Sequence, residues 1–216
     1  MKAMILAAGR GERMGELTVA TPKPLLKVAG QYLIEYSLRA CKAAGINDVI
    51  INVSYHGGRI QAAIGDGAQY GLNVVYSVEP ERLETGGGIV KALAFFEDQP
   101  FLVLSSDIIT DFPLQTVMRA PAHKAHLVMV ANPSFHAEGD FGICDGYANF
   151  DVSPKLTFAN IGVYHPELFL HATPSRFPLN QLLFPAISQK LITAEQYHGR
   201  WYNVGSPKEL ASVVIE

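Results

Sequence analysis

The sequence is poor in charged residues and contains no long apolar segment. Charged residues make up 17% of the 216 residues, and the formal net charge is −3. Proteins that bind nucleic acid mainly through its phosphates need an excess of positive charge, so this class of function is disfavoured. The longest apolar runs are too short to cross a bilayer, and the N-terminus carries no signal-peptide pattern. We therefore expect neither a nucleic acid nor a membrane as a partner.

Cysteines and clusters of metal ligands are also scarce. Cys41 and Cys144 are the only cysteines, and they lie far apart in the sequence. This pattern is typical of a reducing compartment, so we expect a cytoplasmic protein. His123 and His126 have no third ligand at a suitable spacing, and they predict a surface pair rather than a zinc site. The G-x-S-x-G pattern of a hydrolase nucleophile is absent as well.

Strand and helix patterns alternate along the first half of the chain. Apolar runs predict strands at residues 2–6, 48–53, 72–77 and 101–104. Apolar residues at helical spacing predict helices at residues 32–44, 58–64 and 87–96. This alternation predicts an α/β fold with a mostly parallel sheet and helices on both faces.

The second half of the chain is less regular. It predicts strands at residues 125–130, 141–144 and 156–164, and helices at residues 179–189 and 206–214. Pro185 is expected to bend or break the first of these helices, because proline lacks the N–H that a helix interior needs. Ser206 suits the N-cap of the second. No repeat or low-complexity linker divides the chain, so we expect a single domain, residues 1–216.

A glycine-rich segment, L-A-A-G-R-G-E-R-M at residues 6–14, follows the first predicted strand. Neither the Rossmann fingerprint G-x-G-x-x-G nor the P-loop pattern G-x-x-x-x-G-K-[ST] matches this segment, because Met14 stands where each pattern requires a glycine. The two prolines of T-P-K-P-L at residues 21–25 argue against a long helix directly after the loop. Gly9 and Gly11 are therefore expected in an extended loop whose amides can approach an anion.

Two basic residues accompany this loop, Arg13 within it and Lys23 between the prolines. Together the two segments can wrap a triphosphate and neutralise it. L-A-A-G-x-G-x-R-M followed by T-P-K-P-L resembles the signature of the sugar-1-phosphate nucleotidyltransferases. These enzymes join a nucleoside triphosphate to a sugar 1-phosphate and release pyrophosphate. The resemblance implies a Rossmann-like, glycosyltransferase-A-like fold, with a nucleotide-binding half at about residues 1–110 and a sugar-binding half at about residues 111–216.

Two residues are candidates for holding Mg²⁺. Asp107 follows the strand predicted at residues 101–104, where a carboxylate beside a phosphate loop suits this ion. It matches the metal-binding aspartate of the family, and a turn or capping role is the alternative. W-Y-N-V-G-S at residues 201–206 resembles the family's W-x-D-V-G-T, with Asn203 at the second ligand position. Related N-acetylglucosamine-1-phosphate uridylyltransferases also carry Asn there, although an amide brings no charge. Asp111 is expected to order the nearby loop.

The reaction that the resemblance implies is an in-line attack of the sugar phosphate on the α-phosphorus. Positioning and electrostatic stabilisation supply most of the catalysis in phosphoryl transfer. Lys23 is expected to contact the α-phosphate and the sugar phosphate. Arg13 is expected at the β- and γ-phosphates, where its planar fork suits bidentate contacts. With Asp107, these are the predicted catalytic residues, and no general base is needed because the sugar phosphate is already ionised.

Recognition of the base is expected from the phosphate loop and from residues 79–88. The T-G-G-G segment at residues 85–88 precedes a helix, and its amides can read a base edge. Glu79 accepts hydrogen bonds only, so it suits uracil, thymine or guanine N–H groups and suits cytosine poorly. An exposed loop glutamate is the alternative. The predicted nucleotide-binding residues are Ala7, Ala8, Gly9, Gly11, Arg13, Lys23, Glu79, Thr85, Gly86 and Gly87.

The sugar side of the site is less defined in the sequence. Gly142 and Asn160 resemble the glycine and asparagine with which the family contacts the sugar. A buried asparagine has four hydrogen-bonding sites, and a sugar could occupy some of them. Pinning a loop is the alternative role for Asn160.

Within the family, the layout is most similar to the uridylyltransferases that act on N-acetylmuramate α-1-phosphate in peptidoglycan recycling. The similarity rests on the two signatures, on L-E-T-G-G-G-I at residues 83–89 and on the short segment after Gly205. It favours UTP as donor and Mg²⁺ as cofactor. The alternatives are a mannose-1-phosphate guanylyltransferase, a glucose-1-phosphate thymidylyltransferase and, because of Asn203, a catalytically silent nucleotide-sugar sensor. The oligomeric state is not indicated.

Overall fold

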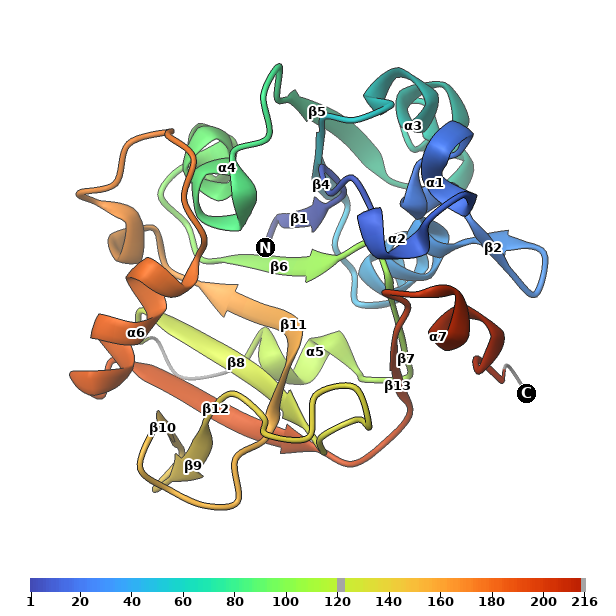
Figure 1. Cartoon of the computed structure of the whole chain (residues 1–216). Helices are drawn as coiled ribbons and strands as arrows, with labels where there is room; N and C mark the ends of the chain where they lie inside the picture. The colour runs from blue at the N-terminus through green and yellow to red at the C-terminus, as the bar shows by residue number, and fades with distance from the viewer. Residues whose placement is uncertain (120–122, 215–216) are drawn as a thin grey trace.

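The computed structural model describes residues 1–119 and 123–214 (Figure 1). Within these residues the main feature is a nine-stranded sheet of order β5-β4-β1-β6-β11-β8-β12-β10-β9. The strands are β1 (Ala3–Leu6), β4 (Asp48–Val53), β5 (Asn73–Val78), β6 (Phe101–Ser105), β8 (Ala125–Val130), β9 (Gly142–Cys144), β10 (Tyr147–Asn149), β11 (Thr157–Tyr164) and β12 (Ile192–Tyr197). Two short ribbons pair β2 (Lys27–Val28) with β3 (Gln31–Tyr32) and β7 (Ile108–Thr110) with β13 (Trp201–Asn203).

The first half of the chain forms the parallel part of the sheet. β5, β4, β1 and β6 all run in parallel, as the alternation of strands and helices predicts. β11 then pairs antiparallel with both β6 and β8, and β12 returns parallel to β8. The predicted α/β fold is therefore confirmed, and the strands that make the large sheet mixed lie in the second half of the chain.

Helices cover both faces of the sheet, as Figure 1 shows. The helices are α1 (Leu17–Ala20), α2 (Leu33–Ala43), α3 (Gly57–Ile64), α4 (Glu84–Ala92), α5 (Leu114–Val117), α6 (Asn180–Ser188) and α7 (Pro207–Ala211). In β1, Ala3 and Ile5 join the core that contains α2, α3 and α5, whereas Met4 joins the core that contains α4 and α6. Strands buried on both faces carry unbroken apolar runs, which is why the sequence predicted them well.

Some elements differ from the prediction. The strands β7, β10, β12 and β13 were not predicted. α6 continues through Pro185, which was expected to bend or break it. Leu183 and Ala186, on either side of the proline, are buried against the sheet, and this packing keeps the helix intact. Ser206 caps α7 as predicted, because its side chain accepts a hydrogen bond from the Glu209 amide.

His126 also differs from the prediction, because it is buried in β8 rather than exposed. Its ring nitrogens lie 2.8 Å from Thr193 Oγ1 and 3.3 Å from Glu195 Oε1. Burial lowers the pKa of His126, although the Glu195 carboxylate opposes this effect. The His126 ring thus links β8 to β12, and among the described residues no group of three or more His, Cys, Asp or Glu side chains is placed to hold a metal.

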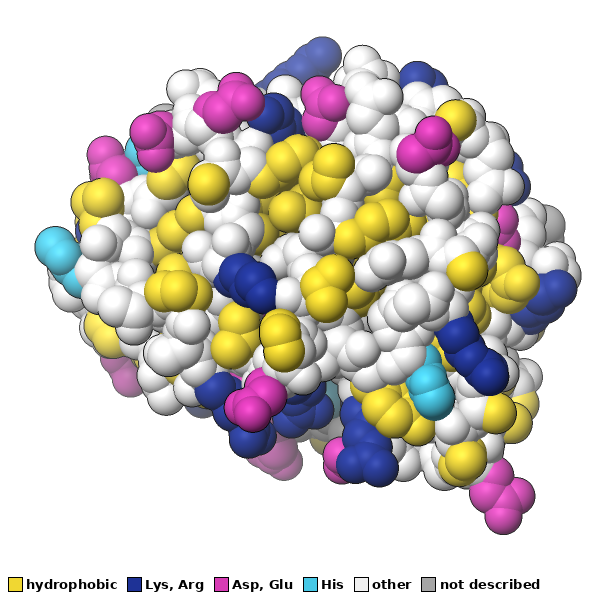
Figure 2. Space-filling model, turned by 90° about the horizontal axis from the view of Figure 1, so that it is seen from above, with side chains coloured by type: hydrophobic (Ala, Val, Ile, Leu, Met, Phe, Trp, Pro, Cys, Tyr) yellow, Lys and Arg dark blue, Asp and Glu magenta, His cyan; other side chains and the backbone are white. Residues whose placement is uncertain are grey.

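The surface reflects the low charge content. Figure 2 shows hydrophobic side chains grouped across the middle of one face, with most charged side chains toward its edge. No helix in the described part of the chain is long and apolar enough to cross a membrane.

Candidate active site

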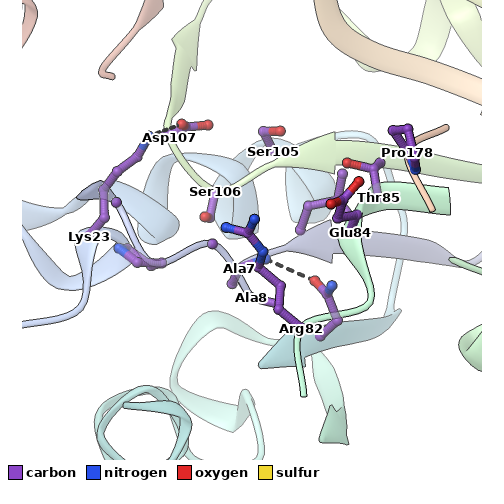
Figure 3. Close-up of a pocket in the computed structure, with 15 residues that line it drawn as sticks. Ala7, Ala8, Lys23, Arg82, Glu84, Thr85, Ser105, Ser106, Asp107 and Pro178 are labelled. Atoms are coloured by element: carbon purple, nitrogen blue, oxygen red, sulfur yellow. Dashed lines mark hydrogen bonds and ion pairs between the residues drawn. The ribbon is translucent and has the colours of Figure 1, made fainter. Parts of the chain in front are cut away.

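A cavity of about 350 Å³ lies at the carboxyl ends of β1 and β6. This is where open parallel sheets bind their ligands. Figure 3 shows Lys23 and Asp107 at one end and Glu84, Thr85 and Pro178 at the other. The lining residues are Leu6, Ala7, Ala8, Gly9, Gly11, Lys23, Pro24, Asn52, Arg82, Glu84, Thr85, Ser105, Ser106, Asp107 and Pro178. The structure thus brings together seven predicted site residues: Ala7, Ala8, Gly9, Gly11, Lys23, Thr85 and Asp107.

The two signature segments pack directly against each other. Gly11 has a φ of 70°, which favours glycine. A Cβ atom at this position would lie 3.0 Å from Lys23 Cβ and 3.2 Å from Thr18 Cγ2. The Gly11 carbonyl also accepts a hydrogen bond from Thr18 Oγ1 at 3.0 Å. Gly11 therefore allows the glycine-rich loop to lie close to Lys23 at the cavity wall.

Lys23 and Asp107 form an ion pair inside the cavity, between Lys23 Nζ and Asp107 Oδ2. Their side chains are only 13% and 17% exposed. Asp107 follows β6, and the amide of neighbouring Ser106 donates to the Leu6 carbonyl at 3.1 Å. This bond ties the end of β6 to the end of β1. The Lys23 ammonium group thus pairs with the Asp107 carboxylate, which was predicted from the sequence to bind a metal ion.

Asn203 lies beside Asp107, although they are far apart in sequence. β7 and β13 pair Asn203 with Ile108, and the Val204 amide donates to the Asp107 carbonyl at 2.9 Å. Asn203 Oδ1 is buried and, among the described residues, is the one buried side-chain N or O atom without a hydrogen-bond partner. A buried polar atom without a partner is costly. Its position next to Asp107 suits an oxygen ligand for a cation.

Asp111 orders the loop that leads into β13, as predicted. Its Oδ1 accepts hydrogen bonds from the Tyr197 hydroxyl and, at 2.8 Å, from the Arg200 amide. The Tyr197 hydrogen bond is the main reason that the pKa of Asp111 is lowered. Asp111 therefore holds the backbone at Arg200 in place through hydrogen bonds.

Arg13 does not line the cavity. It lies in a turn at Glu12–Met14 and is exposed. A Cβ atom at Gly205 would lie 2.7 Å from Arg13 Nη2, so the guanidinium group lies against Gly205. This places Arg13 near the segment that carries Asn203.

Glu79 lies beneath the cavity and does not line it, which corrects the sequence-based expectation. The residue is only 2% exposed. Its Oε1 accepts a hydrogen bond from Asn52 Nδ2 at 2.8 Å, and its Oε2 accepts one from the Leu83 amide at 2.9 Å. Both carboxylate oxygens are therefore occupied by protein donors. Asn52, in contrast, does line the cavity.

Gly86 and Gly87 also have another role than the predicted one. Their amides donate to the Phe177 carbonyl at 3.1 Å and 3.2 Å, so they are not available to a base edge. A Cβ atom at Gly86 would overlap the Phe177 ring, and one at Gly87 would overlap the Ser175 carbonyl oxygen. These glycines allow the segment 175–178 to lie against the start of α4. We call this segment the strap.

The strap also contributes to the cavity wall. Pro178 lines the cavity, and Arg176 Nε lies 3.0 Å from Glu84 Oε1. Glu84 itself lines the cavity and has a φ of 59°, which is unusual for a side chain of this kind. A segment from the second half of the chain thus holds a wall formed by the first half.

The predicted sugar residues lie outside the cavity lining. Gly142 is buried at the start of β9, where a Cβ atom would lie 2.9 Å from Val152 Cβ. Asn160 has a φ of 56° at an irregularity of β11. Because Ile161 pairs with Leu104, Asn160 comes beside Ser105, which lines the cavity. Asn160 is therefore close to the site, whereas Gly142 has a packing role.

Several cavity residues were not predicted from the sequence. Asn52 is a polar residue inside the apolar strand D-V-I-I-N-V, and that exception was the available signal. Arg82 and Glu84 lie within the segment 79–88 that was predicted to read the base, but neither was singled out, because nothing in their local pattern separates them from surface charges. Pro178 reaches the cavity only through the contact between the strap and α4, which local sequence does not encode.

The comparisons with known proteins agree with this geometry. A family profile described as Nucleotidyl transferase matches residues 2–213. N-acetylmuramate alpha-1-phosphate uridylyltransferase of Neisseria meningitidis serogroup B is 43% identical over 217 residues, which cover 95% of this chain and 94% of the relative. Mannose-1-phosphate guanyltransferase of Gibberella zeae is 30% identical over 98% of this chain, which spans only 63% of that relative.

Solved structures share the fold at low sequence identity. A Bacillus anthracis protein assigned as a glucose-1-phosphate thymidylyltransferase superposes with a TM-score of 0.86 at 18% identity, covering 100% of this chain and 97% of that one. HddC from Yersinia pseudotuberculosis, complexed with GMP-PN, gives a TM-score of 0.82 at 18% identity, covering 97% of this chain and 96% of that one. The fold, the profile match and the curated relatives together show that the chain belongs to the nucleotidyl transferase family, as a sugar-1-phosphate nucleotidyltransferase.

Proposed function

We propose that the enzyme transfers a uridylyl group from UTP to N-acetylmuramate α-1-phosphate, in the recycling of peptidoglycan. The observation that carries this proposal is the 43% identity, over 95% of the chain, to a uridylyltransferase of that name. The products are the UDP-sugar and pyrophosphate. The two unpaired cysteines suit a reducing compartment, and we place the reaction in the cytoplasm.

The cavity suits an in-line transfer. An oxygen of the sugar phosphate forms a bond to the α-phosphorus, while the bond from that phosphorus to the bridging oxygen breaks and pyrophosphate leaves. Lys23 is the partly buried cation at the Asp107 end of the cavity, and we assign it to the α-phosphate and the sugar phosphate. The glycine-rich loop cradles the triphosphate. Arg13 is assigned to the β- and γ-phosphates because it lies beside the segment with Asn203.

Asp107 and Asn203 are the residues that would hold Mg²⁺. The carboxylate and the partnerless amide oxygen lie on adjacent segments, and oxygen atoms are the ligands that Mg²⁺ takes. When bound, this ion would neutralise charge on the phosphates and align them. Lys23 would leave Asp107 and turn its ammonium group toward the phosphates.

The choice of base rests on the relative rather than on Glu79, whose carboxylate is occupied. We assign base contacts to Ala7, Ala8 and Thr85, which line the cavity, and we assign Asn160 to the sugar. A mannose-1-phosphate guanylyltransferase is the second candidate, because relatives of that name are about 30% identical over nearly the whole chain.

The test is pyrophosphate release with three substrate pairs, each with and without Mg²⁺. The pairs are UTP with N-acetylmuramate α-1-phosphate, GTP with mannose 1-phosphate, and dTTP with glucose 1-phosphate. Metal-dependent release that is fastest with the first pair supports the proposal. Fastest release with another pair replaces the substrate assignment, and no release from any pair favours a silent nucleotide-sugar sensor.

Asn203→Asp is expected to lower the Mg²⁺ concentration needed for half-maximal rate by roughly 10-fold, because a carboxylate adds a charge to the ligand set. Mn²⁺ binding to the enzyme without substrates should tighten in parallel. Asn180→Asp makes the same chemical change at an exposed position of α6 and serves as the control. An unchanged metal requirement in Asn203→Asp would remove residue 203 from the ligand set.

A further inference from the structure

A buried hydrogen-bond chain joins the two segments that flank the base end of the cavity. The Ala7 amide donates to Asn52 Oδ1 at 2.9 Å, and Asn52 Nδ2 donates to Glu79 Oε1 at 2.8 Å. The Leu83 amide donates to Glu79 Oε2 at 2.9 Å. Ala7 lines the cavity on one side, and Leu83 directly precedes the lining residue Glu84. Figure 3 shows the first of these bonds as the dashed line at Ala7.

The direction of every bond in this chain is fixed. Backbone amides can only donate, so Asn52 must turn its carbonyl oxygen to Ala7 and its amino group to Glu79. The side chain at residue 79 must then provide two acceptor atoms, one for the Asn52 amino group and one for the Leu83 amide. A carboxylate provides both, whereas an amide provides one. Asn52 and Glu79 are 3% and 2% exposed, so water does not replace a lost partner easily.

The helix beside this pair leaves room for it. A Cβ atom at Gly88 in α4 would lie 2.7 Å from Glu79 Oε1 and 3.0 Å from Asn52 Nδ2. Gly88 is buried, and its α4 neighbours Gly86 and Gly87 contact the strap instead. The third glycine of the segment therefore has its own task, which is to admit the hydrogen bond between Asn52 and Glu79.

We propose that Glu79 and Asn52 are positioning residues that act through the Ala7 and Leu83 amides to hold the nucleotide-binding walls of the cavity at a fixed separation. Glu79 thus affects the nucleotide without touching it. This inference rests on the proposed function only in that the cavity binds the nucleoside triphosphate.

The test exchanges the two functional groups. In Glu79→Gln, one of the three hydrogen bonds is lost whichever way the amides turn. In Asn52→Asp, two carboxylates face each other without a donor between them. In the double variant, Asp at residue 52 accepts one hydrogen bond from the Ala7 amide and one from the amino group of Gln at residue 79. The oxygen of that Gln accepts the third hydrogen bond from the Leu83 amide. All three bonds and the net charge are restored.

The readouts are the dissociation constant of the nucleotide, measured by calorimetry on the full chain, and the KM values of both substrates. The nucleotide is whichever of UTP, GTP and dTTP the wild type binds most tightly. Each single variant should weaken nucleotide binding about 10-fold or more, because a buried polar group loses its partner. The KM for the sugar phosphate should change less than about two-fold. The double variant should recover most of the lost affinity.

The alternative outcomes are distinct. If Glu79 reads the base directly, the double variant will stay as weak as Glu79→Gln, and the proposal is overturned. Equal loss for both substrates would indicate a merely structural role and would also overturn it. A wild type that binds none of the three nucleotides would refute the proposed function and this inference together.

Gly88→Ala tests the same chain without changing either polar residue. Alanine is favoured over glycine in a helix interior, yet its Cβ would push Asn52 and Glu79 apart. Nucleotide binding should weaken about 10-fold while the sugar phosphate KM stays unchanged. The control is Gly58→Ala in α3, where an added Cβ would have no atom within 4 Å. Unaltered binding in Gly88→Ala would contradict the proposal.

Discussion

Lys23→Ala is expected to lower kcat/KM by at least ~100-fold, as the loss of one preorganised charge at a transition state typically does. Lys23 is the cation that lies in the cavity beside Asp107, with a side chain only 13% exposed. A charge in a partly buried site is screened little by solvent, so its effect on the phosphates is strong. The measurement is steady-state pyrophosphate release over a range of both substrate concentrations.

The same variant should bind a divalent cation more tightly when no nucleotide is present. Lys23 Nζ pairs with Asp107 Oδ2, so any cation that binds Asp107 must first displace the ammonium group. Removing it should lower the Mn²⁺ dissociation constant roughly 3- to 10-fold, which electron paramagnetic resonance can follow. A variant that simply misfolds would lose both properties. Opposite changes in catalysis and metal affinity are therefore the signature of the assigned role.

Lys27→Ala is the matched control for this experiment. Lys27 is exposed in β2 and lies outside the cavity, although it stands close to Lys23 in sequence. This substitution also removes one positive charge from the same region. Both kcat/KM and the Mn²⁺ dissociation constant should therefore stay near the wild-type values. If Lys23→Ala retained normal turnover, the assignment of this residue to the α-phosphate would be wrong.

The sequence predicted those site residues whose positions follow from the order of strands and loops along the chain. Gly9, Gly11 and Asp107 follow apolar strands, and parallel strands place their carboxyl ends at one edge of the sheet. The position of these residues in one cavity therefore followed from the alternation of strands and helices. The late motif brings Asn203 beside Asp107, although its strand β13 was not predicted and the residue does not line the cavity.

The roles of Glu79 and the T-G-G-G segment did not follow from the sequence. A glutamate in a loop pattern reads equally as a base contact or as a buried acceptor, and only the position of Asn52 separates these roles. A glycine likewise permits a close approach without naming what approaches. The strap that meets Gly86 and Gly87 comes from residues 175–178, and contacts across such a sequence separation leave no local pattern.

Gly87→Ala is expected to be the most damaging of the glycine substitutions, because its new Cβ would overlap the carbonyl oxygen of Ser175. At Gly205 the nearest atoms are the ends of the Arg13 and Glu209 side chains, which can turn away at small cost. A backbone oxygen moves only with its segment, so the strap must shift. The amides of Gly86 and Gly87 would then lose their acceptor, the Phe177 carbonyl.

The loss in stability from Gly87→Ala should combine overpacking with broken hydrogen bonds, in total about 2–4 kcal/mol. For a chain of this length, that corresponds to a fall in Tm of roughly 4–16 °C. Pro178 and Glu84 belong to the cavity wall, so the nucleotide KM should rise about 10-fold at temperatures where the variant remains folded. Thermal unfolding and kinetics, with Gly58→Ala as control, give both quantities. An unchanged Tm would mean that the strap does not press on α4, and a lower Tm with a normal KM would mean that the strap supports the fold without shaping the cavity.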